Sequence, residues 1–319
     1  MSLRPGRAVG PLGHNPRTAR GVWAATAADT SELMLWQISD ERAAPSPNPV
    51  PTQGPLLFVG FSEDGAWLIG SGDGATCAID MRQAGQFRCV PFGSGGEVFA
   101  QAVIPGTHRV AVGTDDRDVK IVDLEAVTRA DVSPQSLGKG KGVVRHLAVS
   151  ADGRWLAALG ENADGRLWDL RAPGSAAIEL GALGAGVKAV AQFSHDRQWL
   201  VVGTGTKLLA WKLARPDSTP TVVRDKLDSS VTALAFGADR KTLLAGMADG
   251  TVLTWDFAAL AEASPMTLGK HRENVVQIAV VDDGSVAVSV GRDTTMHVWP
   301  LTPRRLWQLA ERVRGGRGR

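Results

Sequence analysis

One sequence position recurs seven times along this chain of 319 residues. It closes a short apolar segment, and its occupants are Trp36, Ile79, Val122, Trp168, Trp211, Trp255 and Trp299. The successive spacings are 43, 43, 46, 43, 44 and 44 residues. A unit of this size cannot bury its own apolar faces, so neighbouring copies must stack on one another. A period of about 40–45 residues is typical of propellers built from four short strands per unit.

The clearest copy, residues 231–257, predicts three strands joined by two tight turns. Residues 231–236 and 243–247 are apolar at nearly every position, as in strands covered on both faces. Residues 251–257 alternate between apolar and polar side chains and follow an Asp-Gly turn at Asp249. Variable segments between the copies are expected to hold the fourth, outer strand, at residues 86–93, 176–183, 219–227 and 265–269.

Two further motifs recur with the same period. The last strands end in Trp-Asp at Trp168 and Trp255, and a turn motif appears as FSEDGAWL (61–68), VSADGRWL (149–156) and FSHDRQWL (193–200). With these motifs the chain resembles the WD-repeat β-propeller family over about residues 8–301, and in particular bacterial WD-repeat sensor or scaffold domains. The resemblance implies an all-β, seven-bladed β-propeller of WD-repeat type.

The blades are predicted near residues 8–38, 55–93, 97–138, 143–183, 187–227, 231–269 and 275–301, within one domain of residues 1–301. In the first blade we expect strands at 8–12, 22–26 and 33–38. The Pro-rich segment 39–54 reads as a loop with at most an edge strand, because proline cannot donate to a ladder.

Residues 302–319 predict a short C-terminal helix and a basic tail. Leu306, Leu309, Ala310 and Val313 have the spacing of an amphipathic helix. The sequence leaves open whether the ring is closed by an N-terminal strand or by this C-terminal segment. The tail RVRGGRGR (312–319) is weak support for RNA or acidic protein as a ligand, and a solvated end is the simpler interpretation.

Composition excludes several classes of protein. The formal net charge is +2, which is too small to indicate a nucleic-acid binder by itself. The sequence has no secretion signal and no apolar run of about 18 residues, so we expect a cytoplasmic protein without a membrane span. Arginine outnumbers lysine and alanine is abundant, which favours a bacterial source. Cys77 and Cys89 lie on neighbouring predicted strands and could face each other, but the expected compartment favours buried reduced thiols over a disulfide.

The resemblance implies one four-residue structural tetrad, made by His271, Ser289, Asp293 and Trp299. Histidine, serine and aspartate together could also suggest a hydrolase triad. We favour the structural interpretation, because a buried indole N–H needs an acceptor and the other three side chains complete a satisfied chain.

No residues are predicted to hold a metal or a cofactor, and we expect no catalytic residues. The six histidines are spread along the chain without ligand spacing, and the sequence has no P-loop, dinucleotide fingerprint or nucleophile elbow. The segment GKGKG (138–142) could bind an anion through its amides and lysines, but a connection between blades is the simpler interpretation.

The remaining candidate is a face on which two kinds of loop meet in this family. Connections into the next blade carry basic residues, and turns between second and third strands carry acidic ones. The candidate partner-binding residues are Lys139, Lys141, Arg145, Lys188, Arg224, Lys226, Lys270 and Arg272, with Asp115, Asp116, Glu161 and Asp249. Interleaved charges of this kind favour docking of a complementary protein surface.

We therefore predict a non-catalytic scaffold or sensor that presents a rigid face to a protein or peptide partner. The alternatives are a constitutive structural or regulatory subunit of a bacterial multiprotein complex, and an enzyme propeller. The enzyme is disfavoured because no cluster of histidines or acids converges from several blades.

Overall fold

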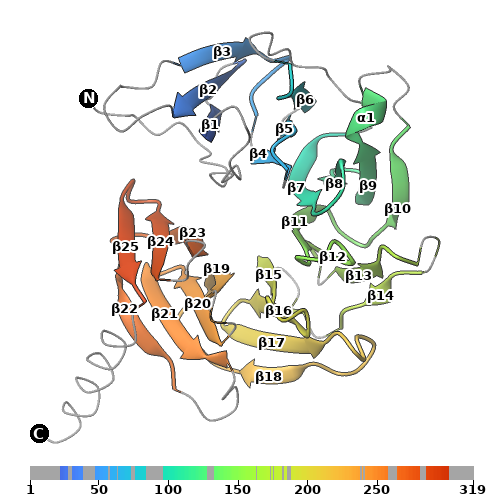
Figure 1. The fold of residues 1–319 in the computed structure, drawn as a ribbon. Helices are drawn as coiled ribbons and strands as arrows, with labels where there is room; N and C mark the ends of the chain where they lie inside the picture. The colour runs from blue at the N-terminus through green and yellow to red at the C-terminus, as the bar shows by residue number, and fades with distance from the viewer. Residues whose placement is uncertain are drawn as a thin grey trace, which may run out of the picture. The chain divides into compact units, whose positions relative to one another are not determined.

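The computed structural model describes residues 22–301, apart from 28–30, 39–46, 57, 63, 73–75, 84–95, 128–132, 163, 173, 175, 182, 185–187, 238, 240, 258–263 and 281–284. It contains seven antiparallel sheets of three or four strands (Figure 1). The predicted fold class, an all-β seven-bladed β-propeller, is therefore confirmed. The predicted strand at 8–12 and the predicted C-terminal helix lie outside the described residues. The chain divides into two compact units, residues 1–179 and 180–319, and each is described by itself.

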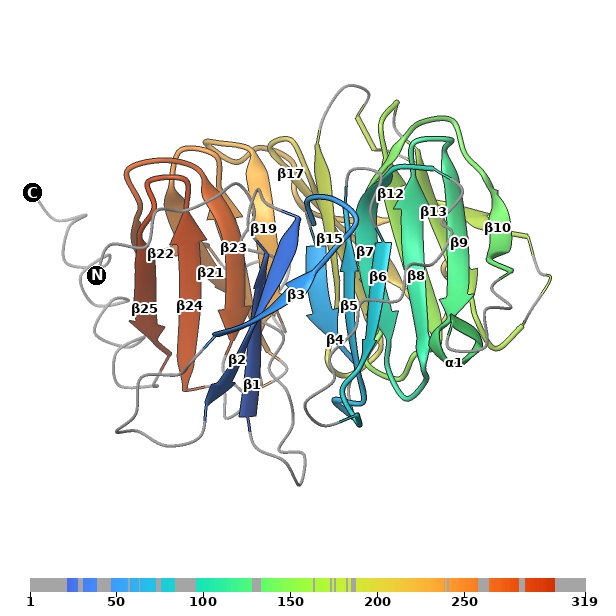
Figure 2. The same cartoon turned by 90° about the horizontal axis from the view of Figure 1, so that it is seen from above.

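The first unit holds four sheets and one short helix, α1 (Leu124–Val127). Its strands are β1 (Val22–Ala27), β2 (Glu32–Ile38) and β3 (Pro47–Pro51); β4 (Phe58–Phe61), β5 (Trp67–Ser71) and β6 (Thr76–Asp80); β7 (Val98–Ile104), β8 (Arg109–Thr114), β9 (Asp118–Asp123) and β10 (Gln135–Lys139); and β11 (Val144–Val149), β12 (Trp155–Gly160), β13 (Gly165–Asp169) and β14 (Ile178–Glu179). In each sheet, strands that are consecutive in sequence lie side by side (Figure 2).

The second unit holds three sheets. Its strands are β15 (Ala189–Phe193), β16 (Trp199–Thr204), β17 (Lys207–Lys212) and β18 (Thr221–Arg224); β19 (Val231–Phe236), β20 (Thr242–Met247), β21 (Thr251–Asp256) and β22 (Met266–Lys270); and β23 (Val275–Val280), β24 (Val286–Gly291) and β25 (Met296–Pro300). The copy at 231–257 forms β19, β20 and β21, so its three predicted strands pair in order.

The Pro-rich segment of the first blade supplies an edge strand. Among the described strands, β3 pairs with β2 alone, which places Pro49 opposite Met34. An edge position suits prolines, because one side of the strand needs no donors. The predicted third strand of this blade, residues 33–38, is the middle strand β2 of the sheet that the structure describes.

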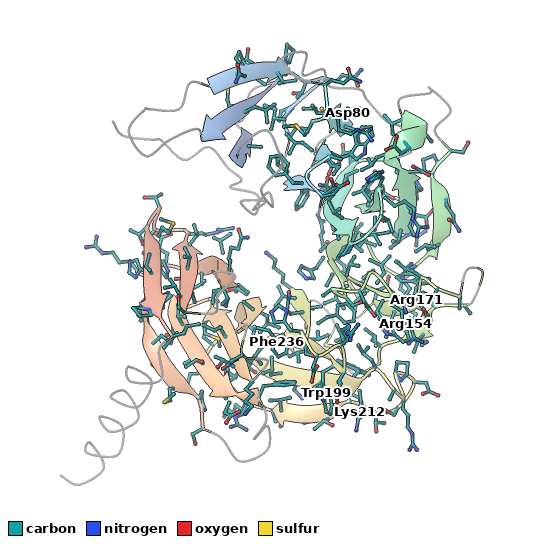
Figure 3. All side chains as sticks on the ribbon, in the orientation of Figure 1. Asp80, Arg154, Arg171, Trp199, Lys212 and Phe236 are labelled. Atoms are coloured by element: carbon teal, nitrogen blue, oxygen red, sulfur yellow. The ribbon has the colours of Figure 1, made fainter. Side chains whose placement is uncertain are left out.

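Apolar side chains from neighbouring sheets pack together within each unit. In the first unit, Leu33 and Leu35 from β2 share a buried cluster with Leu68 and Ile79 from the next sheet. In the second unit, Phe257 lies edge-on to Trp199 at 6.1 Å and to Phe236 at 4.9 Å between ring centroids. Trp199 and Phe236 themselves come from two neighbouring sheets (Figure 3). Such stacking buries the faces that a single blade leaves uncovered.

A glycine–valine contact recurs where consecutive sheets meet. A Cβ atom added to Gly113 would lie 2.4 Å from a Val144 methyl group, and the same addition to Gly246 would lie 2.4 Å from a Val275 methyl group. Gly203 meets Val231 in the same way, at 2.5 Å. The second strand of one sheet thus needs a residue without a side chain where the first strand of the next sheet begins.

The recurring turn motif has one hydrogen-bond pattern in three blades. In the first of them, Ser62 Oγ donates to Asp64 Oδ1 at 2.6 Å and accepts from the Trp67 amide at 2.9 Å. Ser150 with Asp152, and Ser194 with Asp196, repeat this arrangement. Serine and aspartate side chains therefore stabilise these turns locally, which explains their spacing in the sequence.

Candidate functional site: the connection face

We use the term connection face for one end of the strands in each unit. It consists of the turns between second and third strands and the connections that lead to the next sheet, with the strand ends beside them. These are residues 115–117, 139–145, 161–162 and 164 in the first unit, and 188, 205–206, 224–230, 248–250, 270–274 and 292–295 in the second. The antiparallel strand order places these loops at the same end of a sheet. The opposite end carries the turns between first and second strands.

Acidic residues in the turns bind backbone amides of the connections. Asp115 Oδ1 accepts from the Glu97 amide at 3.1 Å, and Asp164 Oδ2 accepts from the Lys141 amide at 3.0 Å. Asp293 Oδ2 accepts from the Arg272 amide at 2.8 Å. These contacts bring the two predicted kinds of loop together, and one of them occupies Asp115, which was predicted to face a partner.

Asp116 is likewise held within the first unit. Its carboxylate accepts from Thr114 Oγ1 and lies 3.2 Å from Lys120 Nζ and 3.5 Å from Lys139 Nζ. Desolvation would raise the pKa of Asp116, but the hydrogen bonds from Thr114 and Lys120 outweigh it and lower the pKa to about 2. Asp116 is therefore a charged structural anchor for neighbouring lysines.

The predicted cations of the first unit also have partners inside the unit. Lys141 Nζ lies 3.2 Å from Glu179, and Arg145 lies 2.8 Å from Glu161. The Arg145 guanidinium also lies 4.3 Å from the ring centroid of Phe99. These pairs are largely exposed, so they hold the loops only weakly and neutralise this part of the connection face.

The GKGKG segment does not offer its amides to an external anion. The Lys141 and Gly142 amides both donate to Asp164 Oδ2, at 3.0 and 3.3 Å, and the Gly140 amide donates to the Arg117 carbonyl at 2.8 Å. Arg166 donates to the Gly138 carbonyl at 2.7 Å and thereby helps to fix the loop. A carboxylate of the chain thus occupies the site that we considered for an anion.

In the second unit the same face keeps exposed positive charge. Lys270 Nζ lies 2.8 Å from Asp249, and Arg224 donates to the Val223 carbonyl at 2.8 Å. Lys188, Lys226 and Arg272 are exposed, and none forms an ion pair with another residue that the structure describes. The two units therefore differ: most of the predicted cations are neutralised in the first and three remain available in the second.

A cavity of about 470 Å³ opens on the connection face of the second unit. Arg224 and Lys226 line it from the connection between β18 and β19, and Asp249 lines it from the turn between β20 and β21. Buried Met247 and half-buried Leu253 add apolar walls. Six of the predicted face residues lie in this unit, and the cavity brings three of them together.

The residues of the expected tetrad lie within hydrogen-bond distance of one another. Trp299 Nε1 donates to Ser289 Oγ at 2.7 Å, and Ser289 Oγ lies 2.6 Å from His271 Nε2. His271 Nδ1 lies 3.3 Å from Asp293 Oδ1. Ser289 is fully buried and accepts from an indole, so its oxygen is not presented to a substrate as a triad nucleophile would be.

Sequence reasoning missed a fifth member, Thr295. Its hydroxyl lies 3.0 Å from His271 Nδ1 and 2.7 Å from Asp293 Oδ1. Desolvation would raise the pKa of Asp293, but hydrogen bonds from Thr295, from two backbone amides and from His271 hold the pKa well below its usual range. A second threonine, Thr251, makes the same contact with Asp249 at 2.8 Å, and this repetition could have revealed Thr295.

The preceding blade shows the same position without the network. Ala245 and Trp255 have the spacing of Ser289 and Trp299, but alanine provides no acceptor. Trp255 Nε1 is buried and has no hydrogen-bond partner among the described residues. Leu227 occupies the position that corresponds to His271. The full network therefore occurs in the seventh blade and is absent from the sixth.

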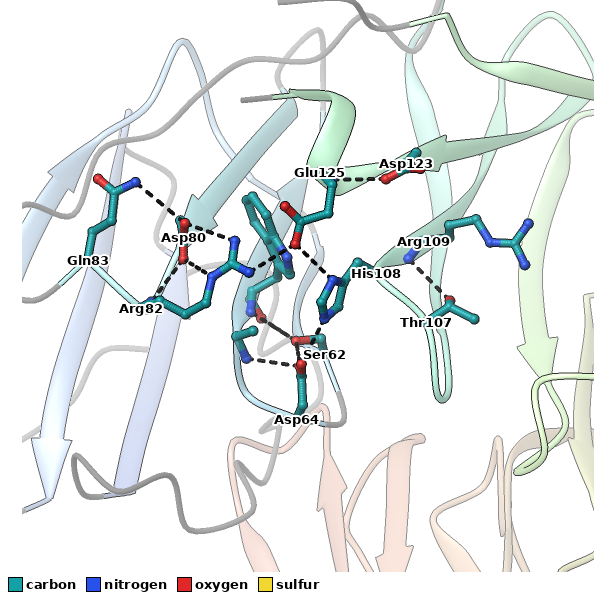
Figure 4. Close-up of polar contacts among 12 residues, drawn as sticks. Ser62, Asp64, Asp80, Arg82, Gln83, Thr107, His108, Arg109, Asp123 and Glu125 are labelled. Atoms are coloured by element: carbon teal, nitrogen blue, oxygen red, sulfur yellow. Dashed lines mark hydrogen bonds and ion pairs between the residues drawn. The ribbon is translucent and has the colours of Figure 1, made fainter. Parts of the chain in front are cut away.

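A second charged cluster, which sequence reasoning missed, lies at the opposite end of the first unit. His108 places Nε2 2.8 Å from Asp64 and Nδ1 2.9 Å from Glu125 (Figure 4). Glu125 also lies 2.9 Å from Arg82, which pairs with Asp80 at 2.8 Å. These side chains come from two neighbouring sheets, so no local motif could have indicated the cluster.

The geometry around His108 favours its charged form. A neutral imidazole donates from one ring nitrogen only, whereas both nitrogens here face carboxylates. The hydrogen bond to Asp64 raises the pKa of His108, and attraction to Asp64 and Glu125 adds to this against partial desolvation. Burial alone would raise the pKa of Asp64, but bonds from Ser62, the Ala66 amide and His108 lower it to about 2.

The prediction of reduced cysteines is wrong. Cys77 is buried on β6 and is disulfide-bonded, and the sequence contains one other cysteine, Cys89, which lies outside the described residues. The prediction relied on the expected compartment and gave it more weight than the predicted position of the two cysteines on neighbouring strands. Among the described residues no three histidine, cysteine, aspartate or glutamate side chains are grouped to hold a metal ion. No helix in the described part of the chain is long and apolar enough to cross a membrane.

Comparison with known proteins identifies the repeat. The profile of the family described as WD domain, G-beta repeat, matches residues 222–256 and 263–300. These two stretches are similar to WD repeats. The two matched stretches contain the cavity lining from Arg224 to Asp249 and the whole network from His271 to Trp299.

Three plant proteins are similar to this chain. The small ribosomal subunit protein RACK1y of Oryza sativa subsp. japonica is 33% identical over 47% of the chain and 44% of its own length. The B-type cell cycle switch protein ccs52B of Medicago truncatula is 25% identical over 85% of the chain and 54% of its own length. The WD repeat-containing protein 26 homolog of Arabidopsis thaliana is 24% identical over 48% of the chain and 26% of its own length. The matches thus span about half of these relatives or less.

Proposed function

We propose that this WD-repeat chain is a non-catalytic protein-interaction scaffold whose connection face binds a protein or peptide partner. The observation that carries the proposal is the exposed charge of Lys188, Lys226 and Arg272, which form no ion pair in the described part of the second unit. One of these cations, Lys226, lines a cavity. Complementary charge steers a partner to such a face and selects among partners.

The backbone of the connection face is fixed before any partner arrives. Turn carboxylates bind the amides of Glu97, Lys141 and Arg272 at the roots of the connections. A preorganised surface loses less conformational entropy when it binds a partner, and this property suits a scaffold. The buried position of Ser289 also argues against the one triad that the sequence could suggest.

The relatives support roles in assemblies and in regulation. One is named as a small ribosomal subunit protein and another as a cell cycle switch protein. A constitutive structural or regulatory subunit is accordingly the second candidate function, and it differs from the scaffold in the permanence of the contact. A bacterial complex, a sensor role and a cytoplasmic location remain proposals that rest on sequence composition and resemblance.

Panning a phage-displayed library of random peptides on the immobilised chain tests the proposal. Selected peptides are then measured against two triple variants of the second unit. One reverses the charges of Lys188, Lys226 and Arg272 on the connection face, and the other reverses Arg197, Arg215 and Lys241 in exposed turns at the opposite end. We expect the first variant to lose binding and the second to keep it. Failure to enrich any peptide, or loss only in the second variant, would refute a binding connection face.

A further inference from the structure

The cavity of the second unit combines two kinds of surface. Arg224 and Lys226 contribute positive charge at the end of β18 and in the connection that follows. Met247 of β20, Leu253 of β21 and Pro265, which directly precedes the outer strand β22, contribute apolar surface. A volume of about 470 Å³ is sufficient to hold one or two amino-acid side chains.

The charge balance of the cavity is positive. Asp249 is neutralised by Lys270 at 2.8 Å and also accepts from Thr251 Oγ1 at 2.8 Å. The lining holds two cations, Arg224 and Lys226, and two anions, Asp228 and Asp249, and Lys270 beside Asp249 brings the formal charge to +1. Lys226 is exposed and forms no ion pair with any residue in the described part of the chain. An incoming carboxylate would therefore meet net positive charge.

The apolar part of the cavity lies along the outer side of the blade. Leu253 and Pro265 are half-buried and Thr267 is exposed, so this part is open to an extended segment. An apolar side chain placed here would cover Leu253, and burying apolar surface contributes roughly 25 cal/mol per Å². The positive part and the apolar part of the cavity together fit a segment in which an apolar residue is followed by an acidic one.

Resting on the proposed function, we propose that this cavity binds an extended segment of a protein partner that pairs an acidic residue with an apolar one. The carboxylate contacts Lys226 beside Arg224, and the apolar side chain lies against Leu253 and Pro265. The cavity thereby selects acidic, leucine-like segments among the peptides that reach the connection face.

Fluorescence anisotropy with three labelled peptides tests this assignment on the full chain. The peptides alternate leucine with glutamate, with lysine, or with glutamine. We expect the glutamate peptide to bind tightest, and its affinity to fall as salt is raised. Lys226→Glu should raise its Kd by about tenfold or more, whereas Lys241→Glu, the same change at the opposite end, should stay within about twofold.

A second variant distinguishes binding inside the cavity from general attraction between opposite charges. Thr267→Trp fills the apolar part without changing charge, and Thr267 is exposed, so the blade should still fold. It too should weaken the glutamate peptide by about tenfold. Equal binding of all three peptides, or loss with Lys226→Glu but not with Thr267→Trp, would overturn the assignment. If panning enriches peptides that depend on Lys188 and Arg272 but not on Lys226, this assignment fails while the scaffold proposal stands.

Discussion

Replacing Ser289 with alanine removes the atom on which the seventh-blade network converges. Ser289 Oγ accepts from Trp299 Nε1 at 2.7 Å and lies 2.6 Å from His271 Nε2. Both His271 and Ser289 are buried, at 2% and 0% exposure. The substitution leaves two polar nitrogens without a partner and adds no bulk.

The cost follows from the two unpaired groups. A buried donor or acceptor left unsatisfied costs about 1–3 kcal/mol. Trp299 is half-buried, and the unpaired Trp255 Nε1 of the sixth blade shows that the fold tolerates an orphaned indole, so Trp299 should contribute near the low end. His271 should contribute more, which gives about 2–4 kcal/mol in total for Ser289→Ala.

Urea unfolding followed by tryptophan fluorescence measures this loss. The matched control is Ser218→Ala, because Ser218 is an exposed serine of the same unit whose hydroxyl donates to the Arg215 carbonyl at 2.7 Å. The control should change the free energy of unfolding by less than about 0.5 kcal/mol. His271→Ala should cost about 1–3 kcal/mol alone, and less when Ser289→Ala is already present. A Ser289→Ala loss no larger than that of the control would refute the network as a source of stability.

Three further outcomes are expected. Ala245→Ser combined with Leu227→His should rebuild the network around Trp255, so the double variant should be more stable than the sum of the single changes by about 1 kcal/mol in a double-mutant cycle; additive effects would contradict it. Because folding raises the pKa of His108, its contribution to stability is full below about pH 6.5 and is lost as the pH rises through the folded-state pKa. His108→Gln should therefore lower the free energy of unfolding by about 0.5–1 kcal/mol at pH 6, a figure reduced for the partial exposure of His108, and by less at pH 9. Equal losses at both pH values would contradict the ion pair. Gly246→Ala should cost about 1–3 kcal/mol in urea unfolding because its methyl group meets Val275, whereas Gly181→Ala, which meets nothing within 4 Å, should be neutral.

The periodic part of the fold was predictable from sequence because strands must repeat their burial pattern in every blade. Residues 231–236 and 242–247 form strands that are largely covered on both faces, and the period of Trp255 and its equivalents alone indicates stacking. The outer strand of the first blade was harder to predict, because proline disfavours interior strands but is compatible with the edge of a sheet. β3 is such an edge strand. The prediction that Cys77 is a reduced thiol failed because it gave the expected cellular compartment more weight than the predicted position of the two cysteines on neighbouring strands.

The candidate site was predictable only in outline. Loop type placed Lys139, Lys226 and Arg272 on one face, but which charges are neutralised depends on side-chain reach across the loops. Asp116 is held by Lys120 and Lys139, whereas Lys226 has no ion-pair partner among the described residues. The His108 cluster joins side chains from two sheets, and no spacing within one repeat encodes such a contact.

The glycine–valine contact gives a blade two matching sides. The sixth blade begins with Val231, which fits Gly203 of the blade before it, and carries Gly246, which fits Val275 of the blade after it. A tandem duplication of residues 231–274 would therefore place Val231 of the new copy against Gly246 of the old one, with the sterics already present at both junctions. The segment acts as a cassette that can be copied in frame, and arrays of this one blade are a practical starting point for building longer repeat proteins.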